Sequence, residues 1–161
     1  MELVATLIAD LPLDERRFHG LLHDIAAVAS VAAITPSGLS AKHYFRAPSS
    51  EDCPADCLLR VAPASALPDD ALKKLRDCGF RPHSILKFQL GQPQKDLGTL
   101  WDLLKDYVNE LQGWVLTAAL DFDQAVARCG SEEGLMQLSH KHGDGSKAVL
   151  ISATTMRQLE L

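Results

Sequence analysis

The segment at residues 97–112 constrains the fold more than any other part of the chain, because its apolar residues recur with the period of an α-helix. They fall on one helical face and comprise Leu97, Leu100, Trp101, Leu104, Tyr107, Val108 and Leu111. Apolar stretches at residues 84–90 and 114–122 flank this segment and are typical of β-strands. Asp96 is placed to cap the start of the helix, and Gly113 to end it in the left-handed conformation. The three segments therefore predict a βαβ unit, whose strands normally run parallel.

The remaining segments predict further strands and short helices around this unit. Strands are expected at residues 2–9, 31–35, 42–47 and 58–62, and helices from about residue 14 and at residues 71–78. Helical turns are expected at residues 124–129 and 154–159, on either side of a hairpin formed by residues 135–139 and 148–152. The sequence therefore predicts one α+β (mixed α/β) domain over residues 1–161, with a central βαβ unit, packed helices and a C-terminal hairpin.

Length and charge narrow the classes of function. The 161 residues suit a single domain with a substantial core. The formal charge of −5, with no run of Lys and Arg, argues against nucleic-acid binding, which usually needs a clustered basic face. The N-terminal apolar run lacks a basic leader and is broken by Asp10 and Pro12, so it does not resemble a secretory signal. No run approaches the roughly 18 apolar residues that suggest a membrane span. We therefore expect a cytoplasmic protein with reduced cysteines.

Histidines supply the main candidate metal ligands. His140, His142 and Asp144 lie close together in the connection of the predicted hairpin, where alternate residues can point to the same side. Neutral imidazoles and a carboxylate can hold a divalent metal with an open position for water. His19 and His23 are four residues apart on a predicted helix, a spacing that also lets two imidazoles reach one metal. A metal-binding protein or metal-dependent hydrolase is therefore one hypothesis, although tight turns use Gly, Asp and polar residues in any case.

Other candidate motifs for catalysis or ligand binding are incomplete. Cys53 and Cys57 are one residue further apart than the CxxC pair of redox and zinc sites, and no second pair repeats their spacing. Asp121 and Asp123 end a predicted strand, and ligand sites gather beyond the carboxyl ends of parallel strands, although one carboxylate can equally cap the next helix. The chain has neither a Gly-rich phosphate loop nor a GxSxG elbow. We therefore expect no cofactor.

Three acidic residues follow the outer face of the predicted long helix. Asp102, Asp106 and Glu110 recur every four residues, and like charges at that spacing cost about 0.2–0.5 kcal/mol per pair in an isolated helix. Lys105 lies off their line and offsets them only in part. Two interpretations follow. The acidic residues either form ordinary solvated surface or dock a basic partner, since charge complementarity speeds association and sets specificity.

The order of elements from His83 onward resembles that of small bacterial proteins of unknown or immunity-type function, encoded near contact-dependent toxin genes. The resemblance is carried by the helix and glycine at residues 97–113, the strand at 114–122 and the hairpin and helical turn at 135–159. It covers about half of the chain and is a similarity of pattern, from which no site residues carry over. It implies a protein that binds a cognate toxin in the cytoplasm without catalysis. We therefore expect a non-enzymatic inhibitor that binds a basic toxin domain.

Overall fold

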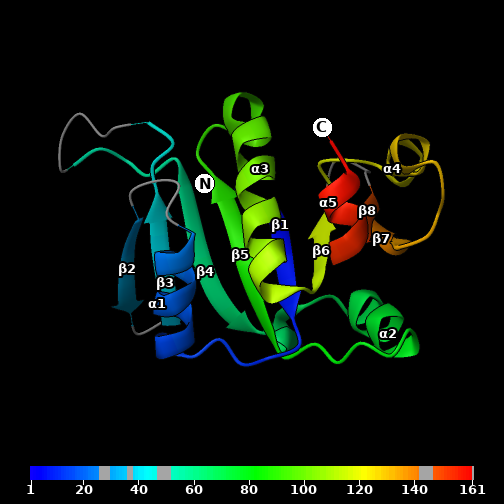
Figure 1. Ribbon diagram of the computed structural model, residues 1–161, viewed down its shortest axis with the longest axis horizontal. Coiled ribbons are helices and arrows are strands. Elements are labelled where there is room, and N and C mark those ends of the chain that lie inside the picture. Colours follow the sequence, from blue (N-terminus) through cyan, green and yellow to red (C-terminus); the bar gives the residue numbers. More distant parts are fainter. Residues whose placement is uncertain (26–29, 36–37, 47–51, 142–146, 161) are drawn as a thin grey trace.

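The computed structural model describes residues 1–25, 30–35, 38–46, 52–141 and 147–160; of residues 30–35, 140 and 141 it describes the backbone alone. Within these residues, one eight-stranded sheet runs through the fold (Figure 1). Across the sheet the strands lie in the order β2 (Ser30–Thr35), β3 (Gly38–His43), β4 (Cys57–Pro63), β5 (Ser84–Leu90), β1 (Glu2–Ala9), β6 (Trp114–Thr117), β8 (Lys147–Ser152) and β7 (Leu135–Lys141). The helices are α1 (Glu15–Asp24), α2 (Asp69–Asp77), α3 (Pro93–Leu111), α4 (Phe122–Cys129) and α5 (Ala153–Gln158), with a 3₁₀ turn, η1 (Ala64–Ala66). This architecture confirms the predicted single-domain α+β fold.

The predicted βαβ unit is formed by β5, α3 and β6 at the centre of the molecule, but its two strands are not neighbours. β1 lies between them and pairs antiparallel with each, so β5 and β6 run parallel to one another with a strand of opposite direction in between. All the strand pairs of the described residues are antiparallel, including the predicted C-terminal hairpin of β7 and β8.

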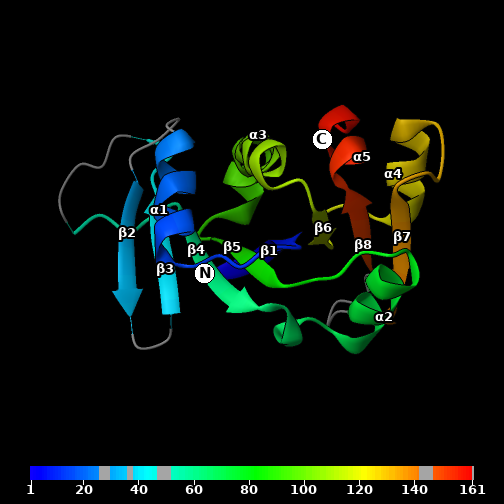
Figure 2. The same cartoon turned by 60° about the horizontal axis from the view of Figure 1, so that its bottom comes forward.

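Helices cover the two faces of the sheet unequally. Figure 2 shows α1, α3, α5 and α4 on one face and α2 on the other. Because side chains alternate along a strand, neighbouring residues of β1 enter different cores. Leu7 belongs to the same cluster as Phe18 of α1 and Leu104 of α3, whereas Ile8 belongs to a second cluster with Leu75 of α2. The larger core therefore lies beneath α3.

The start of α3 differs from the prediction. The helix begins at Pro93, which suits the first helical position because its missing N–H would have no partner there. Asp96 is consequently not a cap. It lies one turn into the helix, is 2% exposed, and its Oδ1 accepts a hydrogen bond from Arg46 Nη1 at 3.1 Å. Arg46 Nη2 also donates to Asp56 Oδ1 at 2.8 Å. The guanidinium thus ties the chain on both sides of residues 47–51 to α3.

The end of α3 also corrects the prediction. Gln112, not Gly113, takes the left-handed conformation, with a φ of 57°. A glycine is needed at the next position for another reason, because a Cβ atom on Gly113 would overlap the carbonyl oxygen of Ile8 in β1. This close approach lets α3 turn directly into β6.

Candidate functional site

The predicted acidic residues lie on the surface of α3. We call Asp102, Asp106 and Glu110 the acidic stripe, and all three are exposed. Four residues exceed one turn of an α-helix by about 40°, so the stripe winds gradually around α3. At its C-terminal end it reaches the side that faces α1, where Glu110 lines a depression between the two helices.

On the side toward α5, α3 carries polar groups that already have partners. Lys105 Nζ donates to Glu160 Oε1 at 2.8 Å, and the Lys105 side chain is only 16% exposed. Arg157 Nε donates to Asn109 Oδ1 at 2.8 Å. Within the described part of the chain, no residue of the acidic stripe forms an ion pair. The negative charge of the stripe is therefore not neutralised from within the fold described.

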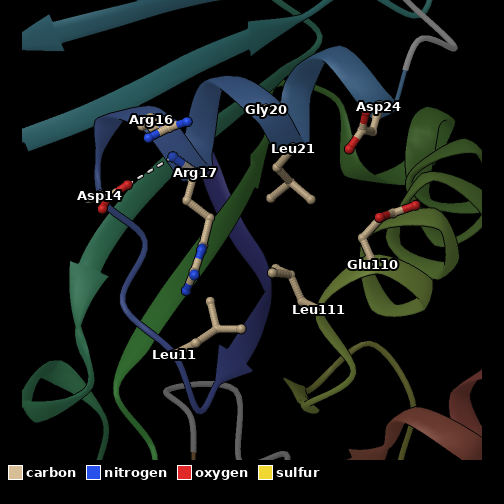
Figure 3. A pocket seen from close by; sticks show the side chains of 9 residues that line it. All are labelled: Leu11, Asp14, Arg16, Arg17, Gly20, Leu21, Asp24, Glu110 and Leu111. Atoms are coloured by element: carbon tan, nitrogen blue, oxygen red, sulfur yellow. Dashed lines mark hydrogen bonds between the residues drawn. The ribbon is translucent and has the colours of Figure 1, made fainter.

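The depression between α1 and α3 is a groove of about 630 Å³ with an apolar floor (Figure 3). Leu11, Leu21 and Leu111 line it, and the last two are nearly buried. Two carboxylates lie across from each other at one end, with Asp24 on α1 and Glu110 on α3. This end of the groove continues the acidic stripe onto a second helix.

The other end of the groove is basic. Asp14 caps α1, because its Oδ1 accepts a hydrogen bond from the backbone N–H of Arg17 at 2.8 Å. The Arg17 side chain extends over the groove between Leu11 and α1 (Figure 3), and its Nη1 donates to the carbonyl oxygen of Pro12 at 3.2 Å. Among the described residues, the guanidinium of Arg17 forms no ion pair with a carboxylate. The groove therefore has an apolar floor, an anionic end and an end where two arginines, Arg16 and Arg17, outnumber the capping carboxylate of Asp14.

A second group of chemically capable side chains is buried beneath α3. His43 Nε2 and Tyr107 Oη are 2.6 Å apart in a hydrogen bond, and Cys57 is the cross-strand neighbour of His43. All three residues are 0% exposed. Burial lowers the pKa of His43 to about 4 and raises the pKa of Cys57 to about 12. It raises the pKa of Tyr107 as well.

The burial of this group, together with its pKa shifts, indicates a structural role. A general base works best with a pKa near the working pH, and the nucleophilic form of cysteine is the thiolate. At neutral pH His43 is uncharged, Cys57 is a thiol, and neither is open to solvent. The group therefore acts as a hydrogen-bonded part of the core. No sequence motif links His43 to Tyr107, 64 residues away, so their hydrogen bond could not be predicted from the sequence.

The structure does not bring together a metal site from the predicted ligands that it describes. His142 and Asp144 lie outside the described residues, and of His140 only the place of its backbone in β7 is described. On α1, His19 Nε2 lies 4.0 Å from Glu15 Oε1, and both side chains are more than half exposed. The part of the chain that the structure describes contains no group of three or more His, Cys, Asp or Glu residues placed to hold a metal ion.

Asp121 and Asp123 have a structural explanation. Asp121 Oδ1 accepts from the backbone N–H of Gln124 at 2.7 Å, and Gln124 Oε1 accepts from that of Asp121 at 3.3 Å, which together cap α4. Asp123 is exposed in the first turn of the same helix. The predicted strand at 114–122 therefore ends early, at Thr117. The reason to expect a ligand site at the end of this strand also no longer applies, because β6 runs antiparallel to both of its neighbours, β1 and β8.

The sheet face opposite α3 gathers basic residues that are dispersed in the sequence. Arg60 of β4 lies directly opposite Lys87 of β5, and Lys42 lies on the next strand, β3, opposite Leu58. These three residues alternate along their strands with residues of the larger core beneath α3. They therefore project from the face of the sheet opposite α3. The absence of a Lys/Arg run in the sequence thus did not exclude a basic surface.

Comparisons with known proteins do not assign this chain to a family. No protein-family model matches the chain, and neither the curated proteins nor the solved structures give a significant match. None of the helices in the described residues is long and apolar enough to cross a membrane.

Proposed function

We propose that the protein is a non-enzymatic binding protein whose acidic stripe docks a basic protein partner. The observation that carries the proposal is the absence of an ion pair on Asp102, Asp106 and Glu110 within the described residues, beside a lysine that is engaged elsewhere. Like charges repeated along one helical face disfavour the free helix. A partner with complementary charge would relieve that repulsion. Its electrostatic attraction to the stripe would also speed association.

The groove beside the stripe gives the same surface a shape. Much of the binding energy of an interface comes from a few anchoring side chains that fill pockets, whereas charges mainly steer the approach. Leu21 and Leu111 contribute to the apolar floor next to the carboxylates of Asp24 and Glu110. In contrast, the buried His43 and Cys57 offer neither access nor suitable protonation for catalysis. A binding role accounts for the exposed features better than an enzymatic one.

Within this class we infer an immunity-type inhibitor, acting in the cytoplasm on a toxin with a basic surface. The inference joins the resemblance in element order over residues 83–159 to the uncompensated charge of the stripe. Sequestering a cationic protein surface requires no cofactor, only complementary shape and charge.

Affinity capture with matched variants tests the proposal. The stripe variant, Asp102→Asn, Asp106→Asn and Glu110→Gln, removes three exposed charges from α3. The control variant, Asp123→Asn, Glu132→Gln and Glu133→Gln, removes three exposed charges from another part of the surface. The wild type and both variants would be immobilised and exposed to lysate of the source organism.

We expect one basic protein to be retained by the wild type and the control variant, with at least a tenfold loss on the stripe variant. That difference corresponds to about 1.4 kcal/mol of binding free energy. Equal retention by all three proteins, or no retained protein at all, would remove the acidic stripe as the binding face.

A further inference from the structure

The groove between α1 and α3 contains a glycine that the fold does not explain. Gly20 lines the groove in the middle of α1, and a Cβ atom there would meet nothing within 4 Å in the described part of the chain. Its φ is not in the left-handed region, so the backbone conformation does not require glycine. Glycine within a helix is unfavourable relative to alanine. The missing side chain leaves a strip of helix backbone uncovered at the edge of the groove.

The charges at the two ends of the groove define what would fit there. Arg17 and Asp24 are seven residues apart on α1, which is about 10 Å along a helix axis. The Arg17 side chain runs away from Asp24, toward Pro12, and lengthens that separation. In an extended peptide, side chains at i, i+2 and i+4 share one face and span about 13 Å. The separation of the two charged ends is therefore comparable to the span of three same-face side chains of an extended segment.

We propose that this groove binds an extended protein segment with an acidic side chain, an apolar side chain and a basic side chain at alternate positions. Arg17 pairs with the acidic side chain, because its guanidinium forms no ion pair within the described residues and donates only to the carbonyl oxygen of Pro12. Leu21 and Leu111 contact the apolar side chain. Asp24 and Glu110 together receive the basic side chain (Figure 3), and Gly20 allows close approach of the segment's backbone. This inference rests on the proposed function, since it names the part of the partner that α3 and α1 hold.

A short peptide and two glycine variants test the inference without knowledge of the partner. The probe is the blocked pentapeptide acetyl-Glu-Ala-Leu-Ala-Arg-amide, and its control replaces both charged residues by Gln. Gly20→Gln fills the groove. Gly98→Gln is the matched control, because Gly98 lies within α3, outside the groove, and a Cβ there also meets nothing within 4 Å in the described chain. Both variants should fold at least as stably as the wild type, since each replaces a helical glycine.

Two-dimensional ¹H–¹⁵N NMR titration gives the readout. We expect saturable shifts at the amides of Gly20, Leu21 and Leu111 with the charged peptide, and at least tenfold weaker binding of the neutral peptide. Gly20→Gln should weaken binding of the charged peptide at least tenfold, and Gly98→Gln less than twofold. Arg17→Gln should bind the two peptides with more similar affinities than the wild type does. Shifts that do not saturate, or that fall elsewhere, or a Gly20→Gln variant that binds like the wild type, would overturn the inference.

The same variants separate this inference from the proposed function. Asp102 and Asp106 lie outside the groove lining, so their double replacement by Asn affects the stripe alone. A captured partner lost by this double variant and kept by Gly20→Gln would support the stripe and refute the groove. The opposite result is a charged peptide that binds in the groove and a captured partner that the double variant retains as well as the wild type does. It would support the groove and refute the stripe.

Discussion

At the scale of single residues, His43 links folding stability to pH. Its pKa is lowered from 6.5 to about 4 by burial, so between these values the unfolded chain binds more protons than the folded protein. The free energy of unfolding should therefore fall as the pH drops from 6.5 to 4, by about 3 kcal/mol in total, and His43 should add no dependence above pH 6.5. Urea unfolding at closely spaced pH values from 4 to 8 measures this decline.

Variants assign that decline to His43. Acidic groups also titrate near the lower end of the range, so the comparison is between proteins. His43→Gln should be less stable than the wild type at pH 7 but should lose stability less steeply toward pH 4. His19→Gln changes an exposed histidine and should follow the wild-type curve. Parallel curves for His43→Gln and the wild type would mean that His43 is not the group responsible.

Two single residues show how far local sequence signals reach. Asp96 and Gly113 flank the predicted helix in the right places, yet each has another role. Asp96 binds Arg46, 50 residues away, and Gly113 makes room for Ile8 of β1. Capping rules use only near neighbours in sequence, whereas both roles depend on residues that the fold brings together. The existence of the helix was predictable, but the structural roles of the residues at its ends were not.

At the scale of elements, the apolar face of α3 is the best predicted feature. Leu104 is 0% exposed and belongs to the large core beneath the helix. Leu104→Ala should lower the free energy of unfolding by about 2–5 kcal/mol, because it removes buried methyl groups and leaves a cavity. Thermal or urea unfolding measures the change. A loss below about 1 kcal/mol would show that the site repacks or that the face is less tightly filled than the structure indicates.

The sheet face opposite α3 carries an unfavourable pair of like charges. Arg60 and Lys87 are direct cross-strand neighbours, and like charges in that position destabilise a sheet. Lys87→Glu places opposite charges there and should raise the free energy of unfolding by about 0.2–1 kcal/mol. In an Arg60→Ala background the same replacement should give a smaller gain, and this double-mutant cycle isolates the pair. An equal gain in both backgrounds would assign the effect to Lys87 alone.

Strand neighbours were harder to predict than strands. The periods of residues 84–90 and 97–112 identify β5 and α3, but no local pattern states that β1 lies between β5 and β6. That insertion makes the strand pairs on both sides of β1 antiparallel, and β6 is also antiparallel to β8, which removes the basis for a ligand site at Asp121 and Asp123. Likewise, Lys42, Arg60 and Lys87 are separated by many residues in sequence and meet only through the order of β3, β4 and β5.

At the scale of the whole molecule, charges of both signs occur on both sides of the sheet, but two groups of like charge lie on opposite sides. The acidic stripe lies on α3, on one side of the sheet, and the basic residues Arg60 and Lys87 project from the other side. The net charge of −5 conceals this division. A basic partner should therefore approach in a preferred orientation, with α3 toward it, because the field of the molecule is not uniform.

Association kinetics separate a docking surface from a face that merely keeps the protein soluble. Replacing Asp102 and Asp106 by Asn, and Glu110 by Gln, relieves two like-charge pairs, so the free energy of unfolding should hold or rise by a few tenths of a kcal/mol. With a captured partner, the association rate should fall and should vary less between low and high salt, since exposed charges act mainly on the approach and are screened by ions. Stopped-flow or surface-based rates at two salt concentrations measure both effects, with the Asp123, Glu132 and Glu133 control variant alongside. Equal rates and equal salt slopes for the wild type and the stripe variant would assign binding to another face, and the basic residues opposite α3 would then be the next to replace.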